Sequence, residues 1–277
     1  MFKRYKPFFR AGAIDLLAYK FNLFTWLIVS ILEVACIVFL WFGVYQSSVD
    51  GMDTIINGFS FKEMICYVVM INIYNFVSFD GTTLWVIDDE IKNGTIAMSF
   101  VKPISYRARF IATTLGSVSM KILMLGIPLF TISYLIFGLI GFITITSVGS
   151  FLLYLLLFVI SQFIAILLTD TINYIFGVLC FYTTSSWGLN QLKEVILQFL
   201  SGSLIPIAFF PGVFKAIATY LPFAGIAQNP VLILLMKLSY IDALKFIGIS
   251  LLWLILLELF AKWLFYTASK KVTVQGG

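Results

Sequence analysis

The sequence predicts an all-α polytopic membrane protein with six transmembrane helices, and two observations support this fold class. Hydrophobic residues make up 61% of the 277 residues and charged residues only 11%, a balance that a soluble domain of this size does not have. The apolar residues also occur in runs of roughly 20 or more, the length that a helix needs to cross a bilayer. We therefore expect a single transmembrane domain that comprises residues 1–277.

Six apolar runs mark the expected spans. In chain order they are Phe21–Val44, Glu63–Trp85, Ile111–Ile140, Ser150–Tyr182, Trp187–Leu204 and Ala243–Tyr266. The third run is longer than a bilayer requires and is interrupted by Gly126 and Pro128. For the fourth run two interpretations stay open: one continuous tilted helix, which we prefer, or a break at Thr169–Thr171.

Two further segments are expected to lie at the membrane without crossing it. Residues 1–20 interleave cations with aromatic and aliphatic residues, as an interfacial helix does when its cations meet lipid phosphates. Residues 202–230 contain four prolines, which exclude a straight span. Short re-entrant helices in the outer leaflet fit this segment, provided that protein covers their backbone.

The distribution of cations predicts the orientation of the chain. Residues 1–20, residues 86–110 and the C-terminal tail together hold eleven Lys or Arg, whereas the opposite side holds Lys62, Lys215 and Lys237. Because cytoplasmic loops carry the excess of cations, we expect both termini and residues 86–110 in the cytoplasm. The cations lie at helix ends rather than in one patch, so we expect contact with membrane lipid and none with nucleic acid.

The longest polar stretch, residues 86–110, is the candidate docking segment for a soluble partner. It begins with three consecutive acids, which a plain loop does not require. We expect these acids in the first turn of a short helix, where the helix dipole favours them, with Gly94 near its end. Pro103 would begin the return into the membrane. The residues assigned to docking are Asp88, Asp89, Glu90, Ile91, Gly94, Thr95, Lys102 and Pro103.

Charged residues inside the predicted spans are candidates for a polar transport path, since each costs a few kcal/mol at the bilayer centre. The candidates are Glu33, Lys121 and Asp170. Neither carboxylate has an obvious partner nearby in the sequence. For four other charges we favour pairing between helices or at an interface: Lys193, Glu194, Glu258 and Lys262.

Catalysis and metal binding are not expected of this chain. It contains no His, no phosphate-binding G-x-x-x-x-G-K-[ST] loop and no constellation of paired carboxylates. If the protein does ATP-driven work, another chain must therefore bind and hydrolyse the nucleotide.

Short motifs spread over nearly the whole chain carry a family resemblance. They are I-x-x-E-I-K-N-G-T-I-A at Ile87–Ala97, K-P-I-S-Y at Lys102–Tyr106, W-G-L at Trp187–Leu189, L-S-G-S-L-I-P-I-A-F-F-P-G at Leu200–Gly212, L-P-F-A at Leu221–Ala224, Pro230, and V-Q-G-G at Val274–Gly277. In this order they resemble the permease subunit of a bacterial type-2 ABC exporter, in particular the six-span subfamily that ends in Q-G-G.

The resemblance implies several functional features. Residues 86–97 would form a coupling helix seated on an ABC ATP-binding subunit, present in two copies, which binds the ATP and Mg; this chain itself would hold no cofactor. A second permease, identical or a paralogue, would complete the pathway in the bacterial cell membrane. The cargo would be hydrophobic or amphipathic (a drug, a peptide or a lipid-like compound), exported by alternating access.

One alternative class of protein is a self-contained, ion-coupled secondary transporter that uses the charges inside its spans. Such a transporter is expected to show an internal repeat, and the sequence shows none.

Overall fold

The computed structural model describes residues 2–18, 20–143, 147–183 and 185–270, and these residues form an α-helical protein. The predicted all-α fold class is therefore confirmed, whereas the V-Q-G-G tail lies outside the described residues. The longer helices are α1 (Phe2–Ala18), α2 (Lys20–Gln46), α3 (Phe61–Ser78), α4 (Thr82–Lys92), α6 (Tyr106–Lys121), α7 (Ile127–Leu139), α8 (Val148–Leu179), α9 (Ser186–Leu200) and α12 (Tyr240–Ser269). The shorter ones are α5 (Ile96–Val101), α10 (Gly212–Tyr220) and α11 (Gln228–Leu234).

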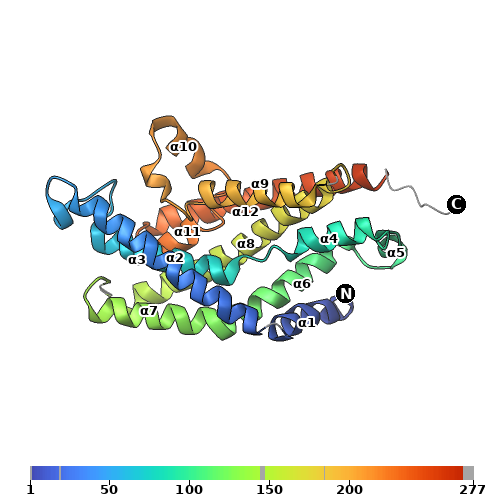
Figure 1. The fold of residues 1–277 in the computed structure, drawn as a ribbon, viewed down its shortest axis with the longest axis horizontal. Coiled ribbons are helices and arrows are strands. Elements are labelled where there is room, and N and C mark those ends of the chain that lie inside the picture. The colour runs from blue at the N-terminus through green and yellow to red at the C-terminus, as the bar shows by residue number, and fades with distance from the viewer. Residues whose placement is uncertain (1, 19, 144–146, 184, 271–277) are drawn as a thin grey trace.

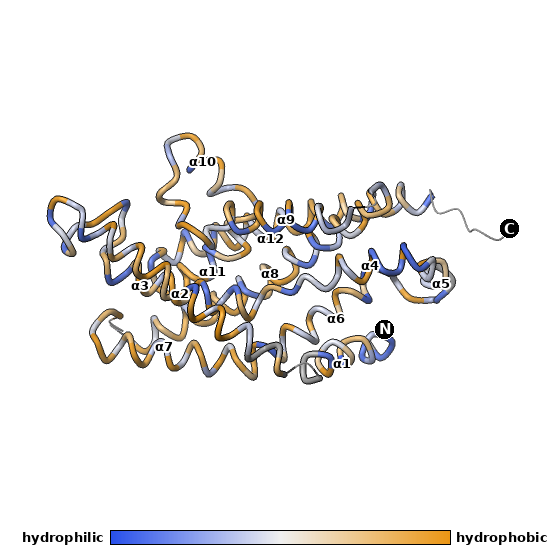
Figure 2. The backbone as a smooth tube through the Cα atoms, viewed as in Figure 1, coloured by the Kyte–Doolittle hydropathy of each residue, from blue (hydrophilic) through white to orange (hydrophobic). Residues whose placement is uncertain are grey.

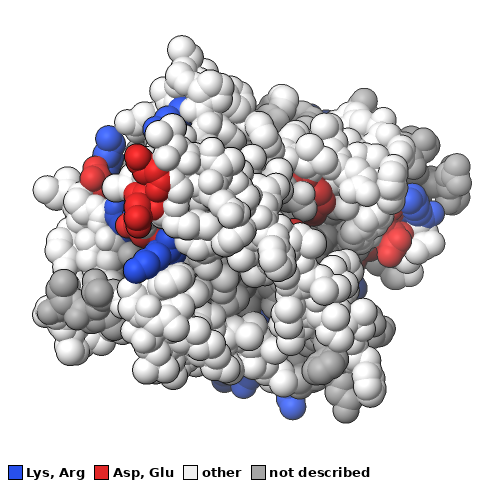
Figure 3. Space-filling view, turned by 60° about the vertical axis from the view of Figure 1, so that its left-hand side comes forward, with Lys and Arg blue, Asp and Glu red and all other residues white. Residues whose placement is uncertain are grey.

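The helices form an elongated bundle. Helix α1, helix α5 and the last turns of α12 lie at one end, the α2–α3 connection and the last turn of α7 lie at the other, and α10 projects from one side (Figure 1). Hydrophobic residues follow most of the helices, while hydrophilic stretches gather around α4 and α5 (Figure 2). Seen from one side, the surface is largely uncharged, and the charged side chains gather in a few groups (Figure 3).

Five stretches of the described chain are helical, long and apolar enough to cross a membrane, one fewer than the six predicted. They are Thr25–Gln46, Phe61–Lys92, Tyr106–Leu139, Val148–Leu179 and Tyr240–Ser269. The missing span is the fifth: its place is taken by α9, which has 15 residues. At about 1.5 Å per residue, such a helix is roughly 22 Å long and falls short of the ~30 Å hydrocarbon core.

The chain after α9 turns into short helices, as the prolines predicted. Gly202 has a φ of 79°, a left-handed conformation that glycine adopts without strain and that stops a helix. A 3₁₀ turn at Ile207–Phe209, then α10 and α11, follow before Ser239 caps α12. The outer-leaflet position of residues 202–230 stays a prediction.

The second span is two helices instead of one, because α3 ends at Ser78, Phe79 is extended, and α4 begins only at Thr82. This break was not predicted. It also overturns the expected position of the three acids: Asp88, Asp89 and Glu90 lie in the last turns of α4 and not in the first turn of a new helix. Gly94, with a φ of 68°, does follow the end of that helix as predicted, and the separate short helix is α5.

The third and fourth spans agree with their predictions more closely. The third is interrupted by a π-helical turn at Ile122–Gly126, and Pro128 lies in the first turn of α7. Helix α8 runs unbroken through Thr169–Thr171, so the continuous interpretation is confirmed and the alternative break is wrong.

The predicted N-terminal helix is present as α1 and packs against α6. Gly12 and Gly116 allow this close approach: a Cβ on Gly12 would overlap the Thr113 carbonyl oxygen, and one on Gly116 would overlap the Phe9 carbonyl oxygen. The Tyr5 hydroxyl lies 3.1 Å from the Ser105 backbone N–H, which donates to it. That α1 lies on a membrane surface stays a prediction.

The largest buried cluster of hydrophobic residues lies mainly between α3, α8 and α11, with contributions from α2 and α7. A second cluster joins α4, α6, α8 and α12. Because α8 contributes to both, it is the central helix on which the other spans are assembled.

Candidate functional site

The break between α3 and α4 is held by side chains from other helices. Asp80 Oδ1 accepts hydrogen bonds from the Thr82 backbone N–H at 3.1 Å and from its hydroxyl at 2.7 Å, and so bonds the first free N–H of α4. Lys121 Nζ donates to the Phe79 carbonyl at 2.9 Å, and Asn173 Nδ2 donates to the Asp80 carbonyl at 2.6 Å. Two carbonyls at the break therefore have side-chain partners, in keeping with the need to satisfy backbone groups inside a membrane.

Lys193 of α9 is buried behind this break, with its side chain 1% exposed. Its Nζ donates to Asn173 Oδ1 at 2.6 Å and to Asn190 Oδ1 at 3.0 Å, and it lies 3.1 Å from Glu194 Oε1. The first of these bonds joins α9 to α8, so the interhelical role favoured for Lys193 is confirmed.

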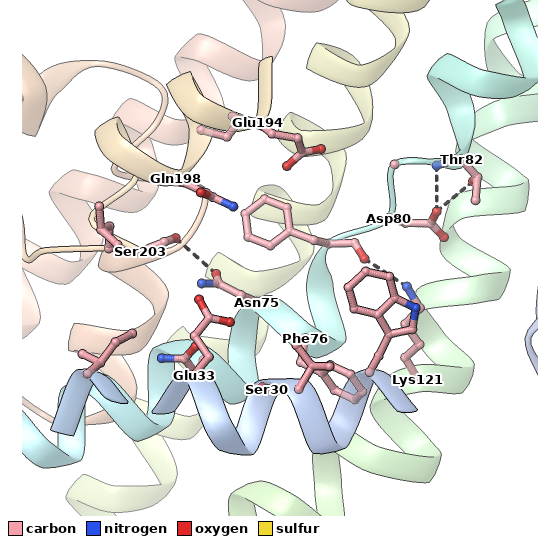
Figure 4. Close-up of a pocket in the computed structure, with 18 of the residues that line it drawn as sticks. Ser30, Glu33, Asn75, Phe76, Asp80, Thr82, Lys121, Glu194, Gln198 and Ser203 are labelled. Atoms are coloured by element: carbon pink, nitrogen blue, oxygen red, sulfur yellow. Dashed lines mark hydrogen bonds between the residues drawn. The ribbon is translucent and has the colours of Figure 1, made fainter. Parts of the chain in front are cut away.

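A pocket of about 690 Å³ opens beside the break, between α2, α3, α4 and α9. Its walls contain the aromatic residues Trp26, Phe76, Phe79 and Trp85 and polar groups on several sides. Figure 4 shows Glu33 of α2 and Glu194 of α9 on opposite walls, with Asn75 between them and its amide bonded to Ser203. The volume and the mixed lining are typical of a site for a small molecule.

Two of the three charges predicted to line a path are found at this pocket. Glu33 and Lys121 both line it, and Glu33 makes no hydrogen bond with any residue drawn in Figure 4. Lys121 is used to hold the Phe79 carbonyl. Their part in transport stays a prediction, but the fold has brought them to one cavity.

Asp170, the third candidate, lies elsewhere, in a buried ion cluster where α4, α6, α8 and α12 meet. Its Oδ2 lies 2.5 Å from Arg107 Nη1, and its Oδ1 accepts hydrogen bonds from the hydroxyls of Thr83 at 2.8 Å and Thr114 at 2.7 Å. Arg107 Nη2 also lies 2.6 Å from Glu258 Oε1. We call these five residues the Arg107 cluster; they support a structural role for Asp170 and give Glu258 a partner on α6.

The predicted docking residues lie around the end of α4 and the turn before α6. Asp89, Gly94, Thr95, Lys102 and Pro103 are exposed. The others contact the rest of the chain. Asp88 is buried and lies 2.7 Å from Lys92 Nζ; Glu90 Oε1 lies 2.8 Å from Arg109 Nη1; and Ile91 packs against the cluster around α8.

Sequence reasoning missed the residues that hold these sites together. Arg107 was counted only as a cation that orients the chain, and Asn173 attracted no attention. The predicted third span began at Ile111 and left Arg107 outside it, whereas the structure begins this span at Tyr106 and so places the guanidinium where it would be costly without a partner. No local pattern marks Asn173 as the partner of a backbone carbonyl more than 90 positions away.

The aromatic pocket lies beside a broken span in a chain with five helical stretches that are apolar enough to cross a membrane, and these features define the class as an α-helical membrane protein. A family model described as "ABC-2 family transporter protein" matches residues 31–276, and the chain belongs to this family. It is therefore a membrane transport component, and its family implies partnership with an ABC ATP-binding subunit. Neither the curated proteins nor the solved structures searched give a match to this chain.

Proposed function

We propose that this chain is the permease subunit of an ATP-driven exporter and that its pocket lies on the path of the cargo. Helix α4 is the observation that carries the proposal. Its first turn contributes Thr82 and Trp85 to the pocket, and its other end exposes Asp89 and Lys92. With 11 residues it is roughly 16 Å long. A partner that moves the exposed end therefore moves a wall of the pocket.

The ATP-binding subunit supplies the energy in this proposal. Two copies bind ATP and Mg and dock on α5 and on the exposed residues Asp89, Gly94, Thr95, Lys102 and Pro103. A second permease subunit, identical or a paralogue, faces the pocket. Closure of the ATP-binding subunits shifts α4, and the pocket opens alternately to the two sides of the membrane.

The charge distribution supports the placement of the complex in the membrane. Residues 86–110 and both termini face the cytoplasm of a bacterium, because they carry the excess of cations. Within the single permease domain, residues 1–20 lie on the inner membrane surface and residues 202–230 dip into the outer leaflet. The exported cargo is hydrophobic or amphipathic, in keeping with the aromatic lining of the pocket.

A charge reversal on the exposed residues tests the docking. Glu90 is unsuitable, because its replacement would also break the ion pair with Arg109. We expect Asp89→Lys with Thr95→Lys to lower ATP-dependent uptake of an amphipathic dye into inside-out vesicles by about tenfold or more, since a wrong charge at an interface costs several kcal/mol. The amount of permease in the membrane should not change.

The matched control is Asp53→Lys, an exposed carboxylate in the α2–α3 connection at the opposite end of the bundle. It should transport like the wild type. Unchanged uptake in the Asp89→Lys, Thr95→Lys variant would refute the docking surface. If the wild-type permease co-purifies with no ATPase subunit, the ion-coupled secondary transporter becomes the better description.

A further inference from the structure

We propose that the pocket selects a cargo with a single positive charge on an apolar body, and that Glu33 is the residue that faces this charge. The inference rests on the proposed function, because it assigns a substrate class to the same pocket. It comes from the charges and rings that the fold has gathered from α2, α3, α4 and α9.

The first step is the charge of the pocket. Three carboxylates line it, those of Glu33, Asp80 and Glu194. Two ammonium groups oppose them: Lys121 in the wall and Lys193, whose Nζ is 3.1 Å from Glu194. Three negative and two positive charges leave an excess of one negative charge. A cargo with one positive charge makes the filled pocket neutral.

The second step is where the excess lies. Glu194 is paired with Lys193. Asp80 accepts from Thr82 with one oxygen, while its other oxygen is buried and has no hydrogen-bond partner in the described chain. Glu33 forms no hydrogen bond with the residues drawn around it, and its carboxylate points into the pocket (Figure 4). It lies in the middle of an apolar span, where a charge without a counter-ion is unfavourable. Glu33 is therefore the carboxylate of this pocket that is exposed and free to meet a cation.

The third step is the shape of the partner. Trp26, Phe76, Phe79 and Trp85 line the same pocket. Aromatic faces attract cations through their quadrupole, most strongly in the case of Trp, and they also cover apolar groups. A quaternary ammonium or phosphonium with aromatic or aliphatic substituents satisfies both the rings and the carboxylate. Anions and doubly charged cations leave the pocket with an unbalanced charge.

Binding to the complete purified complex, without ATP, tests the site separately from transport. The probes are tetraphenylphosphonium and tetraphenylborate, which match in size and differ in the sign of their charge, together with a bis-quaternary dication and the uncharged triphenylphosphine oxide. We expect saturable binding of tetraphenylphosphonium and at least about tenfold weaker binding of the anion and of the dication, a ratio that corresponds to about 1.4 kcal/mol.

Two substitutions of Glu33 sharpen the test. Glu33→Gln should weaken tetraphenylphosphonium binding by about tenfold and leave the uncharged probe unaffected, while Glu33→Lys should reverse the preference and favour tetraphenylborate. Asp53→Asn, which removes an exposed carboxylate that does not line the pocket, is the control and should bind all probes like the wild type.

Equal binding of the two tetraphenyl ions, or an unchanged preference in Glu33→Gln, would overturn the assignment. Either result leaves the proposed function intact if the Asp89→Lys, Thr95→Lys variant still shows the loss of ATP-dependent dye uptake. Conversely, a permease that binds cations selectively and yet purifies without an ATPase subunit would support the cation site and refute the proposal of an ATP-driven exporter.

Discussion

The Arg107 cluster and the pocket both contain carboxylates from membrane spans, but the carboxylate is fully paired in the cluster and left without a partner among the described residues at Glu33 of the pocket. In the cluster, Asp170 has a side chain that is 0% exposed, an arginine at 2.5 Å and two hydroxyl donors. In the pocket, Glu33 is exposed to the cavity and forms no hydrogen bond with the residues around it. The two sites use the same chemical group for different purposes.

The difference lies in what supplies the counter-charge. A buried carboxylate that has lost water must be compensated by its surroundings. Where the protein supplies the whole compensation, as Arg107 does, the charge fixes the packing of four helices and leaves nothing for a ligand. Where the compensation is incomplete, as at Glu33, a molecule from outside can complete it. Charges inside spans therefore have to be sorted by their partners before a role is assigned.

Removal of Arg107 should have the largest effect on stability. Arg107→Met leaves Asp170 and Glu258 without their cation, and breaking such a buried pair typically costs about 3–5 kcal/mol. We expect a correspondingly lower midpoint in detergent-based unfolding, and partial recovery when Asp170→Leu is added. Lys262→Met, an exposed cation on α12, is the control. A variant as stable as the wild type would mean that the cluster does not hold the helices together.

A smaller loss is expected from Glu258→Gln. In the wild type, the Thr171 hydroxyl lies 2.7 Å from Glu258 Oε1. The amide oxygen of the variant can still accept from this hydroxyl and from Arg107, and Asp170 continues to neutralise the guanidinium. Loss of the charge from these bonds should cost about 1–2 kcal/mol in the same unfolding measurement. A loss as large as that of Arg107→Met would show that Glu258, rather than Asp170, is the main partner of Arg107.

The smallest effect on stability should come from Glu33→Gln, within about 0.5 kcal/mol of the wild type. No protein partner is lost, because none of the residues drawn in Figure 4 bonds this side chain. The same variant is expected to change cation binding about tenfold. A strong destabilisation would mean that Glu33, like Asp170, stabilises the fold, and the proposed difference between the two sites would be wrong.

Most of the spans follow from the sequence because they depend on local hydropathy. The apolar runs locate α2, α8 and α12 to within a few residues, and the prolines after Gly202 predict short helices. The break before α4 is different. Asp80 is a charge in this apolar run, but neither it nor Gly81 predicts a break. Lys121 and Asn173 bond the backbone at the break from distant segments, and Lys193 in turn bonds Asn173.

The candidate site was predictable only in part for the same reason. Glu33, Lys121 and Asp170 stood out as charges in apolar surroundings, but their partners did not. Arg107 is 63 positions from Asp170, so a search of neighbouring residues could not pair them. The exposure of Asp89 and the burial of Asp88 depend on which side of α4 packs against the bundle, and the docking role of either residue stays a prediction.

The close crossing of α1 and α6 also bears on how the protein is made. Gly12 and Gly116 are 104 positions apart (116 − 12), so at the usual rate of translation α1 emerges roughly 5–20 s before its partner exists. During that interval its aromatic residues have no protein surface to cover them. If α1 binds the membrane surface, as the sequence predicts, the nascent helix can stay there until α6 is made and then pack against it. Lipid composition would then influence how efficiently the newly made chain matures, long before any cargo is carried.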